Sequence, residues 1–107
     1  MDKAAPTATR ILLVDDNLHG IAARKMILAE QGYEVETALS GEEGWDLFRR
    51  SRFDIVVTDL RMSGMDGIEL ISRIRGSESP VRTILLSGFV GAMRISPAQF
   101  ILAEKNR

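Results

Sequence analysis

Short apolar runs alternate along this chain with longer segments in which apolar and polar residues mix. Uniformly apolar runs of this length are typical of strands that a sheet buries on both faces. The mixed segments begin with helix-capping residues and carry apolar side chains at helical spacing. The pattern therefore predicts strands at residues 10–14, 33–38, 54–58 and 81–86, and helices at residues 18–31, 41–50 and 67–75.

The predicted helices have start signals and apolar faces of their own. Their caps are Asn17 for the first, Ser40 with Glu43 as a capping box for the second, and Asp66 with Glu69 for the third. We expect the first helix to bury one side, which carries Leu18, Ile21, Ala22, Leu28 and Ala29. In the second helix the large apolar residues Trp45 and Phe48 are expected in the core or at an interface.

Strands that alternate with helices through short links predict an α/β fold. Such connections give parallel strands and right-handed crossovers, with helices on both faces of the sheet. The 107 residues are enough for one domain. Doubly wound sheets of this kind bind their ligands beyond the carboxyl ends of the strands, so those ends are the first place to look for a site.

The segment after the fourth predicted strand has a weaker pattern. Residues 88–95 contain two glycines and show no clear period. The sequence Ser-Pro-Ala-Gln at residues 96–99 has the residues of a helix start, with proline in the first turn. We therefore favour a helix over residues 97–107, and residues 100–103 could instead form a short fifth strand.

Composition and charge exclude several classes of protein. With 14 basic and 15 acidic residues the net charge is −1, which gives no electrostatic basis for binding nucleic acid or a membrane. The absence of cysteine excludes disulfides and thiolate metal sites. The apolar runs are too short to span a membrane, and residues 1–9 lack the apolar stretch of a signal peptide. We expect a cytoplasmic protein with a loose tail at residues 1–9 and one domain at residues 10–107, atypical over residues 88–107.

Carboxylates and a hydroxyl stand where the apolar runs end. Asp15 and Asp16 follow the first run, Asp59 follows the third and Ser87 follows the fourth. One such residue alone is usually a cap or a turn former, but parallel strands bring their carboxyl ends together. Crowded carboxylates repel one another unless a cation lies between them, and Mg²⁺ prefers oxygen ligands. The pattern thus favours a Mg²⁺ or phosphate site, in which an aspartate could also be the nucleophile of phosphoryl transfer.

Three segments carry a resemblance to a known family. They are Ile-Leu-Leu-Val-Asp-Asp-Asn at residues 11–17, Ile-Val-Val-Thr-Asp-Leu-Arg-Met-Ser-Gly-Met-Asp-Gly at residues 55–67, and Ile-Leu-Leu-Ser-Gly at residues 84–88. Together they resemble the receiver domain of two-component response regulators, which has a doubly wound, flavodoxin-like parallel sheet. The resemblance covers about residues 10–88, and the separations of Asp16 from Asp59 and of Asp59 from Ser87 also fit the family.

The resemblance implies a role for each of these residues. Asp59 would accept a phosphoryl group from a histidine kinase or a phosphotransfer protein. Asp16 and Asp59 would ligate Mg²⁺ directly, Asp15 would help through a water molecule, and Arg61 would give its backbone carbonyl. Ser87 would be the switch hydroxyl that moves towards the phosphoryl group and changes the surface around the fourth strand. Such a domain would signal by changing shape and would not be an enzyme, apart from its own Mg²⁺-dependent phosphorylation.

The sequence departs from the family in two places. Ser63 stands where a proline is usual, which would loosen that loop. After Ser87 the chain is short for the family's remaining elements, and Lys105 becomes the candidate for the active-site lysine and Phe100 for the aromatic switch residue. A helix over residues 97–107 would remove the lysine and the fifth strand. It would leave the fourth strand at a sheet edge, so we expect self-association there or through the C-terminal segment.

Two other hypotheses remain open. A degenerate receiver would keep the acidic pocket and act as an interaction module that binds partners or dimerises without phosphorylation. A small phosphatase with an aspartate nucleophile would carry a second Asp two residues after Asp59, where this chain has Arg61.

Overall fold

The computed structural model describes residues 8–87 and 101–104, with Ser87 and residues 101–104 described as backbone alone. Seven of the predicted elements are present, and none of their bounds differs by more than one residue from the sequence-based one. In chain order the elements are β1 (Arg10–Val14), α1 (Leu18–Glu30), β2 (Glu34–Ala38), α2 (Gly41–Arg50), β3 (Ile55–Asp59), α3 (Gly67–Gly76), β4 (Arg82–Ser87) and β5 (Ile101–Glu104).

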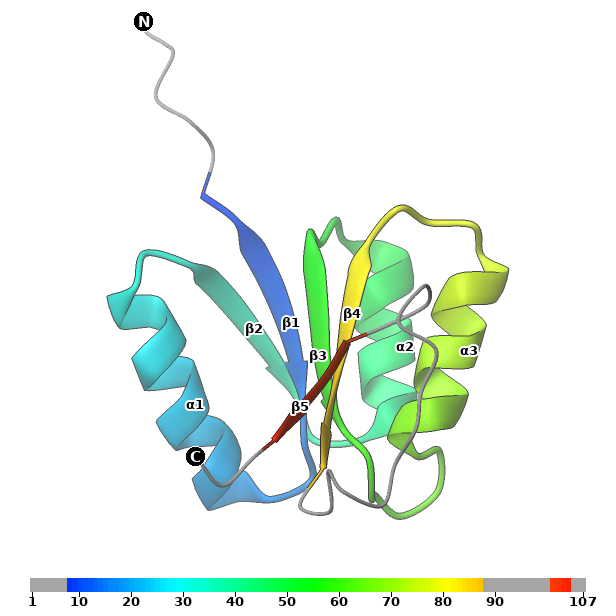
Figure 1. Ribbon diagram of the computed structural model, residues 1–107, viewed down its shortest axis with the longest axis horizontal. Coiled ribbons are helices and arrows are strands. Elements are labelled where there is room, and N and C mark those ends of the chain that lie inside the picture. The colour runs from blue at the N-terminus through cyan, green and yellow to red at the C-terminus, as the bar shows by residue number, and fades with distance from the viewer. Residues whose placement is uncertain (1–7, 88–100, 105–107) are drawn as a thin grey trace, which may run out of the picture.

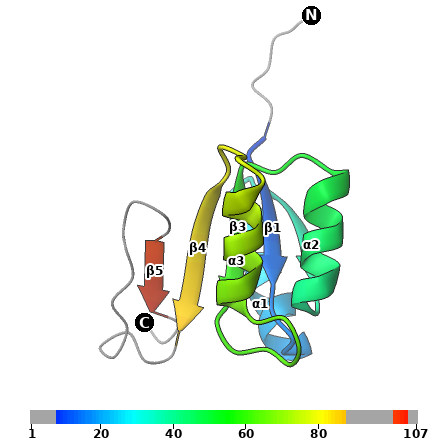
Figure 2. The same ribbon diagram turned by 90° about the vertical axis from the view of Figure 1, so that its right-hand side faces the viewer.

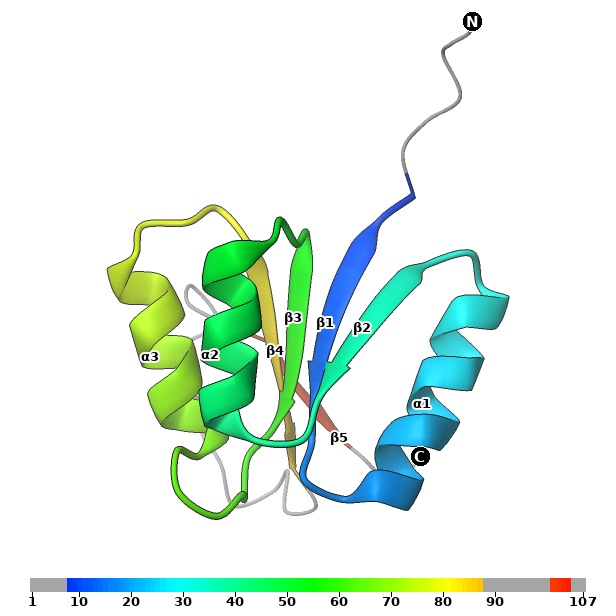
Figure 3. The same cartoon turned by 180° about the vertical axis from the view of Figure 1, so that it is seen from behind.

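The strands form a parallel sheet in the order β2-β1-β3-β4-β5. Helix α1 covers one face, and α2 and α3 lie side by side on the other (Figure 1; Figure 3, from behind). The predicted doubly wound α/β fold is confirmed. The chain moves from β1 to β2 in one direction and from β3 to β4 in the other, so the topological switch point lies between β1 and β3. That is where a sheet of this kind leaves a crevice for a ligand.

The core under α2 and α3 is formed by alternate residues of the strands. Leu12 and Val14 of β1 and Val56 of β3 are completely buried there, against Leu70 and Ile74 of α3. Trp45, Leu47 and Phe48 of α2 pack against this cluster and are partly buried, as predicted for the two aromatic residues. The two ring systems stack with centroids 5.9 Å apart. This packed layer fixes the inner strands, and with them the carboxyl ends that carry the acidic residues.

The predicted helix starts are all present. The side-chain oxygens of the three caps accept hydrogen bonds from main-chain amides two or three residues into the helices. The pairs are Asn17 with Gly20 at 2.9 Å, Ser40 with Glu43 at 3.0 Å, and Asp66 with Glu69 at 2.8 Å. The Glu43 carboxylate completes its box one residue earlier than expected, because it accepts from the amide of Leu39.

Helix α1 does not bury the side that its sequence suggested. Ile21 is its one buried residue, and Leu18, Met26 and Ile27 are each about 60% exposed or more (61%, 65% and 60%). Within the described part of the chain, α1 packs mainly over β1 and β2. Its apolar residues are also spread around the helix, so no single orientation can bury them all.

The helix favoured over residues 97–107 is wrong at residues 101–104, which form β5. This short strand lies parallel to β4, with Ile101 beside Ile84 and Glu104 beside Ser87 (Figure 2). The less favoured alternative, a fifth strand over residues 100–103, was therefore close. Because β5 pairs with β4, the fourth strand is not an exposed sheet edge. The exposed edge from which self-association through β4 was predicted is therefore absent from the described strands. Residues 88–100 and 105–107 lie outside the described part of the chain.

Candidate functional site

The carboxylates predicted to meet do so at the carboxyl ends of β1 and β3. Asp15 and Asp16 follow β1 and Asp59 ends β3, the neighbouring strand. Each can offer one carboxylate oxygen to a common point, and these three oxygens lie within 4.8 Å of one another. Asp15 and Asp59 are buried, at 2% and 7% exposure, whereas Asp16 is exposed. A partly open trio of carboxylates is the kind of donor set that suits a hard divalent cation which keeps some of its water.

Asp15 is held by the main chain and by an arginine. Its amide donates to the carbonyl of Ala38 at 3.1 Å, and its Oδ1 accepts from the amide of Asn17 at 3.0 Å. Its Oδ2 accepts from Nη1 of Arg24 at 2.5 Å. This role of Arg24 was not predicted from the sequence. The only sequence signal is a cation within the helix that follows the acidic pair, and α1 carries Lys25 beside it.

Asp59 lies where β3 passes into a closely folded loop. The buried hydroxyl of Thr58 donates to the Asp59 carbonyl at 2.9 Å. The next amide, that of Leu60, donates to the carbonyl of Leu86 at 3.0 Å, which ties the loop to the end of β4. The amide of Gly67 then donates back to the Leu60 carbonyl at 2.9 Å. A Cβ atom at Gly67 would lie 2.2 Å from the Asp59 carbonyl oxygen, so only glycine allows α3 to start this close to the strand.

The loop between β3 and α3 is fixed although Ser63 replaces the usual proline. Gly64 has φ +74, a left-handed conformation that glycine adopts without strain. The amide of Met65 donates to Oε2 of Glu42 on α2 at 3.0 Å. Asp66 caps α3. These contacts hold the loop from both ends, without the restriction that a proline ring would add.

A depression of about 590 Å³ lies beside the trio. It is lined by Asp16 and by residues of the β3–α3 loop, including Arg61, the predicted carbonyl ligand. The depression therefore lies beside the exposed member of the trio, Asp16.

Comparison with known proteins identifies the family. Residues 11–98 match the family model of the response regulator receiver domain. This chain belongs to the receiver-domain family. The receiver is 39% identical over 84 residues to a protein-glutamate methylesterase/protein-glutamine glutaminase of Anaeromyxobacter dehalogenans, a match that covers 78% of this chain and 24% of that protein. The chain spans between 8% and 30% of the length of the first five curated relatives it matches.

Solved receivers have the same fold. The response regulator TrrA of Thermotoga maritima, in complex with Mg²⁺-BeF, superposes with a TM-score of 0.80 at 31% identity over 92% of this chain and 89% of that one. TrrA in complex with the histidine kinase ThkA gives a TM-score of 0.83 at 33% identity, covering 92% of this chain and 86% of the other. The receiver described here is thus a signalling module of two-component systems. None of its helices within residues 8–87 has the length and apolar composition needed to cross a bilayer.

The residues predicted after β3 are only partly placed. Ser87 is the last residue of β4, and its neighbour Leu86 is in register with Asp59, so its backbone lies next to the acidic edge. Phe100 and Lys105 lie outside the described residues.

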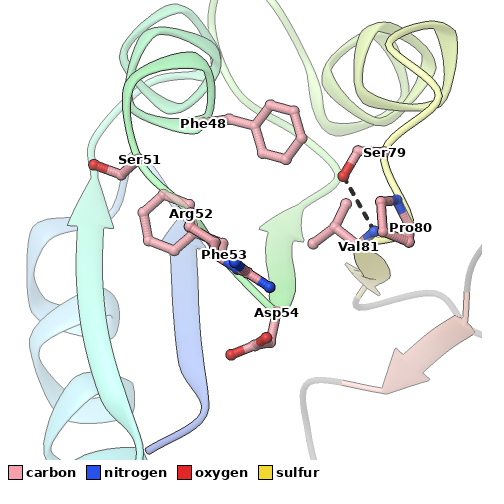
Figure 4. A pocket seen from close by; sticks show the side chains of 8 residues that line it. All are labelled: Phe48, Ser51, Arg52, Phe53, Asp54, Ser79, Pro80 and Val81. Atoms are coloured by element: carbon pink, nitrogen blue, oxygen red, sulfur yellow. Dashed lines mark hydrogen bonds between the residues drawn. The ribbon is translucent and has the colours of Figure 1, made fainter. Parts of the chain in front are cut away.

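A second cavity of this receiver, of about 440 Å³, lies away from the acidic trio (Figure 4). Phe48 and Phe53 form one side and Pro80 and Val81 the other. Its residues precede β3 and β4, whereas Asp59 ends β3, so the cavity is at the opposite, amino-terminal edge of the sheet. It is not part of the site described above.

Proposed function

We propose that this receiver accepts a phosphoryl group on Asp59 from a phosphohistidine donor, either a histidine kinase or a phosphotransfer protein. The observation that supports this most directly is the convergence of three carboxylate oxygens within 4.8 Å at the switch point of the sheet. Asp59 ends the strand that leads into the loop lining the depression, and the family match includes its whole surrounding segment.

In the proposed step a carboxylate oxygen of Asp59 attacks phosphorus. The new P–O bond forms as the P–N bond of the phosphohistidine breaks, and the histidine nitrogen leaves with the electron pair. The product is an acyl phosphate. The Thr58 hydroxyl bonds to the Asp59 carbonyl and the Gly67 amide bonds to the Leu60 carbonyl, and both bonds hold the backbone around Asp59 in place. Less conformational freedom is therefore lost when the Asp59 carboxylate reacts.

The donor set fits Mg²⁺. Asp16 and Asp59 would hold the ion directly, Asp15 through a water molecule, and Arg61 through its backbone carbonyl. When bound, Mg²⁺ neutralises charge on the transferred phosphoryl group. Three carboxylates this close repel one another, so a divalent cation would also relieve strain in the site.

The output is proposed to travel along the end of β4. The bond between the Leu60 amide and the Leu86 carbonyl joins the acidic loop to the residue before Ser87. A phosphoryl group on Asp59 would attract the Ser87 hydroxyl and shift the population towards a second arrangement of this edge.

Self-association is a further proposed route for the output. Because β5 lies outside β4 in the sheet, the proposed self-association would take place through the edge of β5 rather than through β4. Sedimentation at micromolar concentration tests this, since a receiver that stays a monomer with and without a phosphodonor would reject it.

The phosphorylation proposal is tested with acetyl phosphate and Mg²⁺. We expect intact-mass measurement to find one phosphoryl adduct on the wild-type chain and none on Asp59→Asn. The matched control is Asp46→Asn, which removes an exposed carboxylate on α2 that pairs with Arg49 and Arg50 and lies outside the trio. This control should be phosphorylated like the wild type.

Other results would contradict the proposal. No adduct on the wild type, together with partner binding that ignores phosphodonors, would favour the degenerate receiver that acts as an interaction module. An adduct that persists in Asp59→Asn would place the acceptor elsewhere. Turnover of a generic phosphomonoester would support the phosphatase hypothesis instead.

A further inference from the structure

The acidic site already holds a cation that belongs to the protein. Arg24 on α1 lies with Nη1 2.5 Å from Oδ2 of Asp15. The Asp15 side chain is 3% exposed and that of Arg24 28%, so the pair is shielded from water more than a surface ion pair is. An ion pair in such surroundings is stronger than one between fully exposed groups.

The path of the Arg24 side chain explains how it reaches the site. Long side chains of a helix point back towards its N-terminus, and α1 begins beside the acidic residues. One turn before Arg24 stands Gly20. A Cβ atom there would lie 3.5 Å from Arg24 Nη1, an ordinary contact distance, so the guanidinium lies directly beside Gly20. The side chain of Arg24 thus runs back along α1 towards Asp15.

We propose that Arg24 is an internal counter-ion that competes with Mg²⁺ for the acidic site. In the metal-free receiver its guanidinium neutralises Asp15, and it lowers the affinity of the trio for the divalent cation. This inference rests on the Mg²⁺ site of the proposed function and names a residue that regulates it. The receiver would then require a higher Mg²⁺ concentration for phosphorylation than the same trio without the arginine.

Two effects of Arg24 oppose each other, and the contacts decide between them. As a positive charge it repels Mg²⁺, and as a partner of Asp15 it helps to position a carboxylate of the site. The positioning has other support, because Asp15 keeps the Asn17 amide on Oδ1 and its own amide bond to Ala38. The Asn17 amide and the Ala38 carbonyl carry no net charge, so neither would repel Mg²⁺ in place of Arg24. Loss of Arg24 should therefore tighten Mg²⁺ binding.

The test compares two substitutions on the same turn of α1. Arg24→Met removes the charge next to Asp15 and keeps a long side chain. Lys25→Met removes an equal charge from an exposed neighbouring residue. In calorimetric titrations with Mg²⁺ alone at low ionic strength, we expect Arg24→Met to bind about three- to tenfold more tightly than the wild type, from charge repulsion over several ångströms at close to the dielectric of water, because the site is open at Asp16. Lys25→Met should bind like the wild type.

A second variant and a second readout keep the result interpretable. Arg24→Lys retains the charge and should remain near the wild-type affinity. Without metal, Arg24→Met should unfold at a lower temperature than the wild type, and Mg²⁺ should raise its unfolding temperature by a larger amount. Unchanged or weaker Mg²⁺ binding by folded Arg24→Met would overturn the inference.

The outcomes separate this inference from the function it rests on. If the wild type binds Mg²⁺, Asp16→Asn abolishes that binding and Arg24→Met leaves it unchanged, only the role of Arg24 fails. If neither the wild type nor Arg24→Met binds Mg²⁺, the proposed metal site fails together with it.

Discussion

At the scale of single residues, the site depends on a position with no side chain at all. Gly67 donates its amide to Leu60 and lies against the carbonyl of Asp59. Glycine is required at this position for steric reasons. An added Cβ would lie 2.2 Å from the Asp59 carbonyl oxygen and 2.8 Å from the Leu85 side chain. Backbone atoms cannot rotate away as the end of a flexible side chain can, so the loop itself would have to shift.

We predict that Gly67→Ala lowers the free energy of unfolding by about 2–3 kcal/mol, the usual cost of forcing extra volume into a packed position. The control is Gly76→Ala, where nothing lies within 4 Å of the added Cβ. Its position at the end of α3 should gain up to about 1 kcal/mol from the better helix propensity of alanine. Urea unfolding followed by circular dichroism measures both, and equal effects of the two substitutions would reject the steric explanation.

The sequence predicted the location of a site residue where that residue directly follows or ends a strand. Asp15, Asp16 and Asp59 could be assigned to one edge because parallel strands share their direction. Arg24 could not, because its contact with Asp15 depends on where α1 lies relative to the end of β1. A cation in a helix has no sequence feature that distinguishes a solvated role from this one.

At the scale of elements, α3 is positioned by one buried side and α1 is not. Leu70 of α3 is completely buried, whereas Ile68 on the same helix is 40% exposed. We predict that Leu70→Ala lowers the free energy of unfolding by about 2–5 kcal/mol, from lost burial and the cavity left behind. Ile68→Ala should cost well under half as much. The two variants are compared by urea unfolding, and a cost at Ile68 as large as at Leu70 would contradict the assigned orientation of α3.

The elements that were predicted well are those whose signals are local. Capping at Asn17, Ser40 and Asp66 needs only a few neighbouring residues, and it fixed the helix starts. The exposure of α1 was not predicted, and a strand near residues 101–104 was only the less favoured alternative to a helix. Both depend on what packs alongside, since β5 exists through its pairing with β4 and the capping residues ahead of it favoured a helix.

At the scale of the whole molecule, Mg²⁺ binding and folding should be linked. A ligand that binds only the folded state stabilises it, by about 2.7 kcal/mol at a hundredfold excess over Kd. We therefore predict that millimolar Mg²⁺ raises the unfolding temperature of the wild type, and that Asp16→Asn removes most of this increase. The measurement is thermal unfolding over a Mg²⁺ series. A rise of the same size in Asp16→Asn would mean that the ion binds elsewhere.

The sequence by itself determined the α/β class, the strand and helix positions up to residue 87, and the three aspartates of the site. It could do so because periodicity, capping and strand direction are properties of short segments. Only the tertiary structure decided the partner of Asp15, the exposure of α1 and the pairing of residues 101–104 with β4. These depend on how separate elements pack against one another, and no single segment of the sequence contains that information.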